Sequence, residues 1–422
     1  MSTKLQAVRG MNDILPADIG IWHHVESEIR SLTAAYGYLE MRVPMMERTD
    51  LFYRSIGALT DIVDKEMYTF VDKNGDSLTL RPEATASCVR AGIQHGLFHN
   101  QHLKLYYMGP MFRHERPQKG RYRQFHQFGI EAFGLPGPDI DCELMQLGRR
   151  LWQRLNIQDI RLELNSLGTP EVRQCYEAAL VGYLSQHQDS LDDDSRRRLQ
   201  TNPLRILDSK VKTTQAIVAG APTIDEFYDE TTGRHFTGLC ERLDTLGIAY
   251  HVNRKLVRGL DYYTKTVFEW VTESLGAQNA VCAGGRYDLL VENLGGRPTY
   301  GVGFALGLDR LVELARQGGG QFDPVSDVYF VALGDAAELQ AAKLGETLRD
   351  AGCSVRMNFS GGNLKKQLRR ADQSGARLAV ILGDSERNER VVLLKNLRRD
   401  SAQERVSQEK LVEHVKQHLL SS

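Results

Sequence analysis

Two neighbouring segments, residues 106–115 and 124–134, alternate apolar side chains with polar or aromatic ones. This alternation predicts the two strands of a hairpin, because alternate residues of a strand share a face. One face of the second strand carries Phe125, Gln127, Gly129 and Glu131, and the opposite face carries Phe128, Ile130 and Ala132. The first face is polar where a core would be apolar, and its glycine leaves room for a ligand. We therefore expect this face to form the floor of a binding site.

Positive charge is concentrated at the tip of the predicted hairpin. Arg113 and Glu115 are expected to share a face of the first strand, where a guanidinium can bind a phosphate and a carboxylate can accept from an amine. The connecting loop adds Arg116, Lys119, Arg121 and Arg123. Such a charge density suits a polyphosphate or the end of a nucleic acid. A solvated charged hairpin has the same composition, so the alternation alone leaves both interpretations open.

The composition is ordinary for a soluble globular protein. The 422 residues are 41% hydrophobic and 25% charged, no apolar run is long enough to span a bilayer, and the N-terminus lacks a secretory signal. The formal net charge of -1 indicates that any contact with RNA depends on locally placed basic residues. The six cysteines are isolated and lack zinc-ligand spacing. We expect a cytoplasmic protein with reduced thiols, no membrane contact and no dedicated metal cluster.

Helix and strand signals alternate in the first part of the chain. Residues 18–36 carry apolar side chains at helical spacing and lead into a strand-like segment at 38–43. The Asn-Gly pair at 74–75 predicts a hairpin with a two-residue turn. Pro82 at a first helical position, with Glu83 in the first turn, predicts the start of another helix.

The predicted domains follow from changes in these signals. Residues 168–248 are charged helical segments with few strand signals, which predicts a helical insertion. Strand signals return beyond it, so the stretches on both sides are expected to form one mainly antiparallel sheet in a domain of residues 1–320. A glycine-rich linker at 317–324 precedes alternating strand and helix signals, which predict an α/β domain at 326–422.

The hairpin resembles motif 2 of the class II aminoacyl-tRNA synthetases, in the form typical of the histidyl-tRNA synthetase family. The resemblance rests on Phe112-Arg-His-Glu, on the basic loop and on Gln124-Phe-His-Gln-Phe-Gly-Ile-Glu. It implies that Arg113 contacts the α-phosphate of ATP, that Glu115 meets the adenine and that Phe125 stacks on it.

The same resemblance assigns the other polar residues of the hairpin. It implies that Gln127 and Glu131 hold the amino acid and that Arg121 belongs to the ATP site. Three further residues are expected at the acceptor end of the tRNA, and these are Arg116, Gln118 and Arg123.

Other segments resemble the family in the expected order. Ala7-Val-Arg-Gly-Met-Asn-Asp-Ile-Leu-Pro resembles its N-terminal signature, and Arg42-Val-Pro resembles motif 1, which implies a homodimer. Thr79-Leu-Arg-Pro-Glu-Ala-Thr resembles a segment in which the positions of Glu83 and Thr85 bind the α-ammonium of the substrate. Glu83 would equally suit a helix N-terminus without any ligand. An alanine stands between them where glycine is usual, so we expect negative φ there.

Leu256-Val-Arg-Gly-Leu-Asp-Tyr-Tyr-Thr-Lys-Thr-Val-Phe-Glu resembles a segment specific to the histidine enzyme. It implies that Arg258 neutralises charge at the reacting α-phosphate and that Tyr262 and Tyr263 line an imidazole pocket. A carboxylate and a phenol are suitable partners for the two ring nitrogens of an imidazole. From the residues alone, ordinary buried tyrosines with satisfied hydroxyls remain the alternative.

Tyr300-Gly-Val-Gly-Phe-Ala-Leu-Gly-Leu-Asp-Arg-Leu resembles motif 3, which implies that Arg310 meets the γ-phosphate of ATP. Asp309 replaces the more frequent glutamate and keeps the charge. The glycines are spaced GxGxxxG, unlike the dinucleotide fingerprint. Upstream, Ala283-Gly-Gly-Arg-Tyr-Asp places two glycines and an aromatic after a strand, where a ligand can approach the backbone.

The resemblance implies an α+β fold, with an antiparallel sheet flanked by helices, a helical insertion and a C-terminal α/β anticodon-binding domain. It implies that L-histidine is activated with ATP and Mg²⁺ and transferred to tRNA(His), with Arg113, Arg258 and Arg310 as the catalytic residues. The alternative from another class is the non-catalytic, synthetase-like regulatory subunit of ATP phosphoribosyltransferase. That subunit usually lacks the C-terminal domain and loses the substrate residues. In this sequence both the C-terminal segment and the substrate residues are present.

Overall fold

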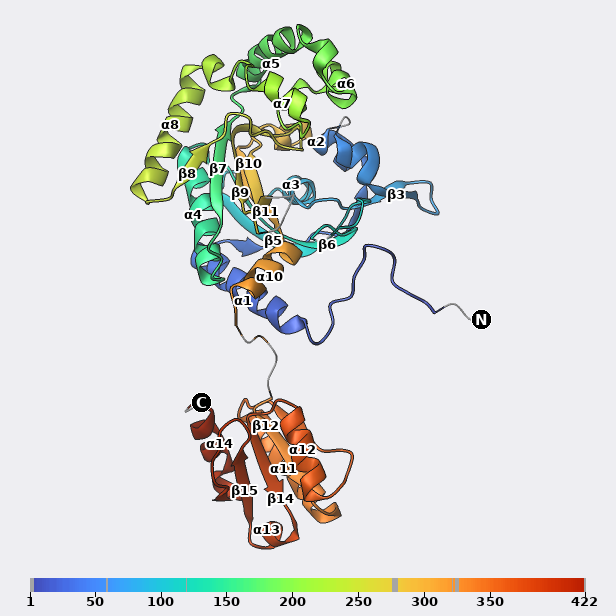
Figure 1. The fold of residues 1–422 in the computed structure, drawn as a ribbon, viewed down its shortest axis with the longest axis vertical. Coiled ribbons are helices and arrows are strands. Elements are labelled where there is room, and N and C mark those ends of the chain that lie inside the picture. Colours follow the sequence, from blue (N-terminus) through green and yellow to red (C-terminus); the bar gives the residue numbers. More distant parts are fainter. Residues whose placement is uncertain are drawn as a thin grey trace. The chain divides into compact units, whose positions relative to one another are not determined.

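The computed structural model describes residues 4–57, 60–118, 120–274, 280–320, 322 and 326–420. The chain divides into two compact units, Met1–Phe322 and Asp323–Ser422 (Figure 1). Each unit contains its own cluster of buried apolar side chains, so each is described by itself. Lys119 of the expected basic loop lies outside the described residues, as do residues 321 and 323–324 of the predicted linker.

An eight-stranded sheet forms the centre of the first unit (Figure 1). Its strands, in spatial order, are β1 (Leu39–Glu40), β5 (Leu103–Phe112), β6 (Gln124–Phe133), β11 (Gly301–Gly307), β10 (Ala280–Arg286), β9 (Thr264–Val271), β7 (Arg161–Ser166) and β8 (Tyr250–Val252). Neighbours are antiparallel except that β1 is parallel to β5 and β7 is parallel to β8. The predicted α+β class and the mainly antiparallel sheet are therefore confirmed.

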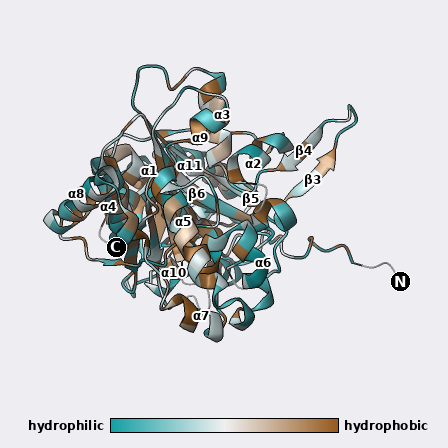
Figure 2. Cartoon of the chain, turned by 90° about the horizontal axis from the view of Figure 1, so that it is seen from above, coloured by the Kyte–Doolittle hydropathy of each residue, from teal (hydrophilic) through white to brown (hydrophobic). Residues whose placement is uncertain are grey.

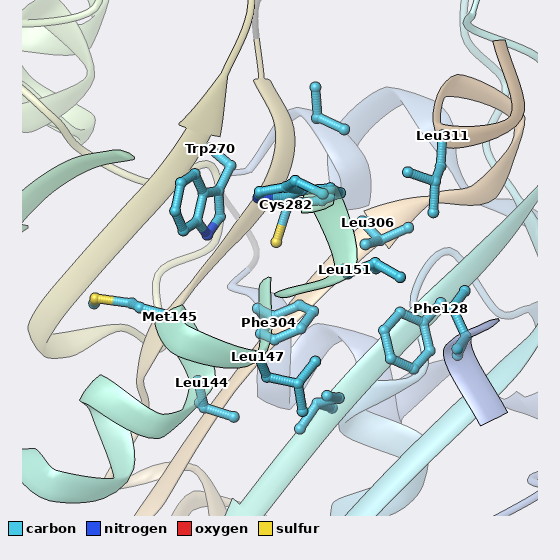
Figure 3. Packing of buried hydrophobic residues seen from close by; sticks show 14 of the residues in the cluster. Phe128, Leu144, Met145, Leu147, Leu151, Trp270, Cys282, Phe304, Leu306 and Leu311 are labelled. Atoms are coloured by element: carbon cyan, nitrogen blue, oxygen red, sulfur yellow. The ribbon is translucent and has the colours of Figure 1, made fainter. Parts of the chain in front are cut away.

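One face of this sheet is apolar and is covered by the helices α1 (Ile19–Ala35), α4 (Pro138–Arg154) and α10 (Leu308–Gln317). Phe128 and Ile130 of β6 are buried there with Phe304 of β11, and the rings of Phe128 and Phe304 lie 5.9 Å apart between centroids. Figure 3 shows Phe304 beside Leu147 of α4. Each fully buried side chain of this size stabilises the fold by roughly 1.5–3 kcal/mol. The apolar half of the predicted alternation is thus confirmed as core.

The opposite face of the sheet is covered only in part, by the helices α2 (Thr49–Ile56), α3 (Thr85–Gln94) and α9 (Leu290–Asn293). Val89 of α3 and Val291 of α9 share a buried cluster with Phe133 of β6 and Val267 of β9. This second layer fixes α3 against the sheet and leaves the polar residues of β6 beside the start of that helix.

Two predicted boundaries in this region, and the length of one predicted turn, are wrong. The strand expected at 38–43 is limited to Leu39–Glu40, and beyond it the carbonyls of Val43 and Pro44 accept hydrogen bonds from the side chain of Arg81 at 2.7 and 3.3 Å. The expected hairpin forms between β3 (Tyr68–Val71) and β4 (Ser77–Leu80), which join β2 (Met46–Arg48) in a small sheet. Its loop is residues 72–76 rather than a two-residue turn.

The cause of the longer hairpin loop is the side chain of Asp72. Its carboxylate accepts from the backbone N–H groups of Asn74 and Asp76 at 2.8 and 2.9 Å, which closes an Asx-type loop. Gly75 within it has φ of +89°, a conformation that favours glycine.

Helix α3 begins at Thr85 rather than at Pro82. The carboxylate of Glu83 accepts from the backbone N–H groups of Thr85 and Ala86 at 2.6 and 3.0 Å. Glu83 therefore caps the helix from outside instead of belonging to its first turn. Ala84 has φ of −114°, as expected for a non-glycine residue.

The stretch predicted as a helical insertion forms the helices α5 (Pro170–Ser185), α6 (Asp193–Thr201), α7 (Lys212–Val218) and α8 (Glu230–Thr245). Single turns lie at Gln188–Ser190, Pro203–Ile206 and Ile224–Phe227, and a π-helical turn lies earlier at Ile62–Glu66. The insertion has a core of its own, in which Tyr176, Leu180 and Ile206 are buried. The side chains of Thr169, Asp192 and Asp229 cap three of these helices.

The second unit is a five-stranded sheet with helices. Its strands, in spatial order, are β13 (Val355–Met357), β12 (Val328–Ala332), β14 (Leu378–Leu382), β15 (Val391–Asn396) and β16 (Glu404–Ser407), and its helices are α11 (Asp335–Asp350), α12 (Leu364–Gln373), α13 (Asp384–Asn388) and α14 (Leu411–Leu420). β12 is parallel to β13 and β14, whereas the last two strands are antiparallel additions. No helix in the described parts of either unit has the length and apolar character needed to cross a membrane.

Candidate active site

The polar face of the large sheet has small residues on its middle strands. Gly129 of β6 pairs with Ala305 of β11, which pairs with Ala283 of β10. The space above Gly129 is filled by Tyr107 of β5, since a Cβ atom on this glycine would lie 2.3 Å from the phenol oxygen. The open part of the floor therefore begins at Ala305, and the expectation that Gly129 itself makes room for a ligand is wrong.

A cavity of about 270 Å³ lies over this floor. Seven of the residues singled out in the sequence line it together, and these are Arg113, Glu115, Arg121, Phe125, Gln127, Arg258 and Arg310. Four of the seven are arginines, two from the hairpin loop and two from later parts of the chain. A cavity with this lining has a positive potential and suits an anionic ligand.

Arg113 and Glu115 lie beyond the end of β5, so the prediction that they share a face of that strand is wrong. Arg113 still donates its N–H to the carbonyl of Arg123 at 2.9 Å, but the backbone then turns, because Glu115 donates its N–H back to the carbonyl of Arg113 at 2.7 Å. Arg113 donates from Nε to the carbonyl of Pro82 at 2.8 Å, and its guanidinium carbon is 5.3 Å from the centre of the Phe125 ring. Both residues still reach the cavity, from its rim.

Arg121 and Arg310 form the side of the cavity next to the basic loop. Arg121 is paired with Glu115 at 2.8 Å. Arg310, in the first turn of α10, donates to the carbonyls of Gly120 and Ala280 at 3.0 and 2.6 Å. Burial, together with the nearby charge of Arg121, lowers the pKa of Arg310. These contacts tie the loop to β10 and hold two positive charges near each other.

A buried group of polar side chains adjoins the cavity. Glu131 is 1% exposed and accepts from the hydroxyl of Thr85 at 2.6 Å and from the hydroxyl of Tyr287. Burial raises the pKa of Glu131 to about 8, against the hydrogen bonds from these hydroxyls. The rings of Tyr262 and Tyr263 lie 4.7 Å apart, and Tyr262 also contacts Tyr287.

Two glycines of the motif 3 segment make room for this group. A Cβ atom at Gly303 would lie 2.0 Å from a carboxylate oxygen of Glu131, and one at Gly301 would lie 2.5 Å from the ring of Tyr287. These glycines therefore serve a close approach between side chain and strand rather than a dinucleotide. The conclusion that this segment is not a dinucleotide motif agrees with its place on an antiparallel strand.

Comparison with known proteins shows which family the chain resembles. Residues 10–311 match the family model described as histidyl-tRNA synthetase, and residues 327–418 match the model described as anticodon binding domain. The chain belongs to the histidyl-tRNA synthetase family. The crystal structure of apo S. aureus histidyl-tRNA synthetase is 35% identical, with a TM-score of 0.83 and coverage of 98% of this chain and 100% of that one.

Two further solved structures share the fold. The histidyl-tRNA synthetase from Nostoc is 22% identical, with a TM-score of 0.72 and coverage of 99% of this chain and 100% of that one. A protein from Bacillus halodurans, described as an ATP phosphoribosyltransferase regulatory subunit/histidyl-tRNA synthetase, is 23% identical, with a TM-score of 0.64 and coverage of 88% and 97%. At these identities the likeness concerns the fold alone.

The three residues expected at the acceptor end of the tRNA do not belong to the lining of the arginine-rich cavity. Arg116 and Gln118 are exposed on the loop. Arg123 is half-buried and donates from Nε to the carbonyl of Glu115 at 3.3 Å, while its backbone N–H donates to the carbonyl of Gly10 at 2.7 Å. The N-terminal signature thus packs against the basic loop.

Two tyrosines of the site were not predicted as site residues. Tyr107 donates its hydroxyl to Gln127 at 3.0 Å, and Tyr287 donates to Glu131. The register of the hairpin could have found Tyr107, because it stands opposite Gly129 on the polar face. Tyr287 follows the paired glycines of the segment at 283–288 but lies beyond the end of β10, where alternation gives no signal.

The raised pKa of Glu131 predicts a dependence of stability on pH. The unfolded carboxyl ionises near pH 4.3, whereas the folded one keeps its proton until about pH 8. The native state therefore binds more protons in between, and its stability falls as the pH rises. The substitution Glu131→Gln should remove this loss of stability. Between pH 5 and pH 7 the free energy of unfolding of the variant should therefore rise, relative to that of the parent, by about 1 kcal/mol per pH unit.

The measurement is urea unfolding of both proteins without ligands at pH 5, 6 and 7. Glu230→Gln is the control, since this exposed carboxylate pairs with Arg234 at the surface and its replacement should show no such trend. A difference between Glu131→Gln and the parent that stays constant over this range would mean that Glu131 is already ionised at pH 5.

Proposed function

We propose that this chain is a catalytically active histidine–tRNA ligase, which forms histidyl-adenylate from L-histidine and ATP and then transfers histidine to the 3′ end of tRNA(His). The observation that carries the proposal is the junction of two sites. An arginine-lined cavity adjoins the buried group of Glu131 and tyrosines, since two of its lining residues, Arg258 and Gln127, contact the tyrosines Tyr263 and Tyr107. The first suits a polyphosphate and the second suits a polar side chain with two nitrogens.

The first step needs positioning and charge stabilisation rather than a protein nucleophile. The carboxylate of histidine attacks the α-phosphate of ATP, a new C–O–P bond forms, and the bond to pyrophosphate breaks. We assign Arg113 and Arg258 to the charge that develops on the α-phosphate, and Arg310 to the γ-phosphate. Phe125 and Glu115 then hold the adenine, by stacking and by accepting from its amine. Donors that are fixed before the reaction need no reorganisation during it.

Histidine selection is assigned to the buried polar group. Glu131 accepts from one imidazole nitrogen and a hydroxyl of Tyr262 or Tyr263 meets the other, with Gln127 beside them. Glu83 and Thr85, at the start of α3, take the α-ammonium. Buried polar groups that lose their partners are costly, so an amino acid without two ring nitrogens is rejected.

Mg²⁺ enters this proposal as part of the ATP substrate. The described residues contain no group of three His, Cys, Asp or Glu side chains suited to a metal ion. Mg²⁺ is commonly held by one or two carboxylates together with phosphates. Asp309, a carboxylate of the cavity lining that has no other role in this proposal, is assigned to it.

The tRNA is assigned to two surfaces. Arg116, Gln118 and Arg123 of the hairpin loop are placed at its acceptor end. In the second unit, α12 carries exposed basic residues, of which Lys365, Lys366 and Arg369 are examples. We also place the protein in the cytoplasm, in keeping with cysteines that are free and mostly buried.

A homodimer is supported by exposed apolar side chains near motif 1. They lie on β1, before and on β2, and on β3, and comprise Leu39, Met45, Met46, Phe70 and Val71, which are 43–68% exposed. Figure 2 shows the β3–β4 hairpin projecting from its unit with apolar residues on β3. Exposed apolar side chains that form one patch mark an interaction surface, and we assign these residues to such a patch.

ATP–pyrophosphate exchange with each of the standard amino acids tests the proposed function. Exchange that depends on histidine alone is expected. No exchange with any amino acid would favour a regulatory protein with the synthetase fold, and exchange with another amino acid would overturn the assignment of the buried pocket.

Arg258→Ala should lower the rate of histidine-dependent exchange by roughly 100- to 1,000-fold, because a donor to the developing charge is lost. The KM for histidine should change by less than about 3-fold, since the contact strengthens mainly in the transition state. Arg197→Ala, at an exposed arginine of the insertion, is the control and should leave both values unchanged. Near-normal exchange in Arg258→Ala would remove this residue from the mechanism.

Val71→Asp should dissociate the proposed dimer, because a charge at a 68% exposed apolar position would be buried in the interface. Size-exclusion chromatography with light scattering at micromolar concentration measures the mass. Leu339→Asp introduces the same change at a 73% exposed leucine of the second unit and should leave the dimer intact. A parent protein that elutes at the monomer mass would refute the dimer itself.

A further inference from the structure

Two carboxylates stand side by side on the polar face of the sheet, beyond the small residues of the floor. Glu269 of β9 pairs in register with Ala283 on one side and with Glu163 of β7 on the other. The side chains of Glu163 and Glu269 are 16% and 19% exposed, so neither is fully solvated. Like charges opposite each other destabilise a sheet unless each has a partner.

The partners of these two carboxylates differ. Glu163 accepts from the side-chain amide of Asn253 at 2.7 Å and lies 3.6 Å from Arg161. Glu269 accepts from the guanidinium of Arg258. The two glutamates therefore share chemistry, strand register and burial, but only Glu269 contacts the proposed catalytic arginine.

Arg258 depends on such a contact for its position. It lies between β8 and β9 in a segment without helix or strand, so no regular backbone ladder orients it. Its guanidinium carbon is 5.6 Å from the centre of the Tyr263 ring, and its Nε atom is buried without a hydrogen-bond partner. A long side chain on irregular backbone has many rotamers, and an ion pair with a residue in the centre of a strand removes most of them.

We propose that Glu269 is the positioning residue of Arg258, which holds the guanidinium over the floor so that its remaining N–H groups face the reacting phosphate. This inference rests on the proposed function. Glu269 does not touch the substrate in this assignment and acts only through Arg258. The ion pair fixes the position of the positive charge before ATP binds. The ring of Tyr263 further restricts the rotamers of the guanidinium.

Glu269→Gln and Glu269→Asp test the proposal in histidine-dependent pyrophosphate exchange. The amide keeps the shape and loses the charge, whereas the aspartate keeps the charge and is one methylene shorter. Both should lower kcat by roughly 10- to 100-fold, because a displacement of about 1 Å in a catalytic group has effects of this size. The KM values for histidine and ATP should stay within about 3-fold of the parent.

Glu163→Gln is the matched control, since it removes the neighbouring carboxylate on the same row without touching Arg258. Its kcat should stay within about 2-fold of the parent, given that its partners lie outside the lining of the small cavity. A loss in Glu163→Gln equal to that in Glu269→Gln would mean that the charge of the sheet surface matters rather than a contact, and would overturn the proposal.

A double-mutant cycle decides whether Glu269 acts through Arg258. In the Arg258→Ala background, adding Glu269→Gln should change kcat by less than about 2-fold, because the residue to be positioned is gone. The proposal would be refuted if the two substitutions together lowered kcat by the product of their separate effects. It would also be refuted if Glu269→Gln had the same kcat as the parent. Should Glu269→Gln not fold, Glu269→Asp completes the same cycle and is judged by the same outcomes. Histidine-dependent exchange by the parent tests the proposed function separately. A failure of the proposed function can therefore be told apart from a failure of the role proposed for Glu269.

Discussion

The burial of the Glu131 carboxyl group is the constraint on which the rest of the site depends. A polar group that is 1% exposed must find its partners within the protein. Thr85 at the start of α3 and Tyr287 after β10 supply hydroxyl donors, and Gly303 on β11 leaves the space that the carboxyl group fills. The position of α3, the strand order and the glycines of β11 are therefore parts of one arrangement. A shift in any of them would leave a buried polar group unpaired.

The two faces of the large sheet divide stability and chemistry between them. Phe128 and Phe304 pack with the helices α1, α4 and α10 on one face, and this apolar layer supplies the stability of the unit. The other face can then hold Glu131 and Arg258 in places that burial makes unfavourable. This division explains why the strands alternate so regularly in β6 and β11, where each apolar residue has a polar or small neighbour.

Much of this arrangement could be predicted from residue patterns, and the failures have physical causes. Alternation placed Gln127 and Glu131 on one face because the period of a strand is two residues. It failed for Arg113 and Glu115, since a strand can end wherever a local turn takes the next N–H of the ladder, here that of Glu115, which donates to the carbonyl of Arg113. It also could not show that Tyr107 fills the space over Gly129, which depends on side-chain packing across strands. The chemical role of each residue came from family resemblance, because spacing alone did not separate ATP from RNA or name an amino acid.

The arginines of the cavity show how a nearly neutral chain can form a strongly positive site. Arg113 and Arg121 come from the hairpin loop, Arg258 and Arg310 come from two later segments, and charges of one sign around a cavity of about 270 Å³ repel each other. Each is held by an acceptor of its own, which is Pro82 for the first, Glu115 for the second, Glu269 for the third and Gly120 for the fourth. These acceptors offset the electrostatic repulsion among the arginines in the folded protein, before any ligand binds. A polyphosphate then finds donors that are already in place, which is the condition under which electrostatic catalysis is most effective.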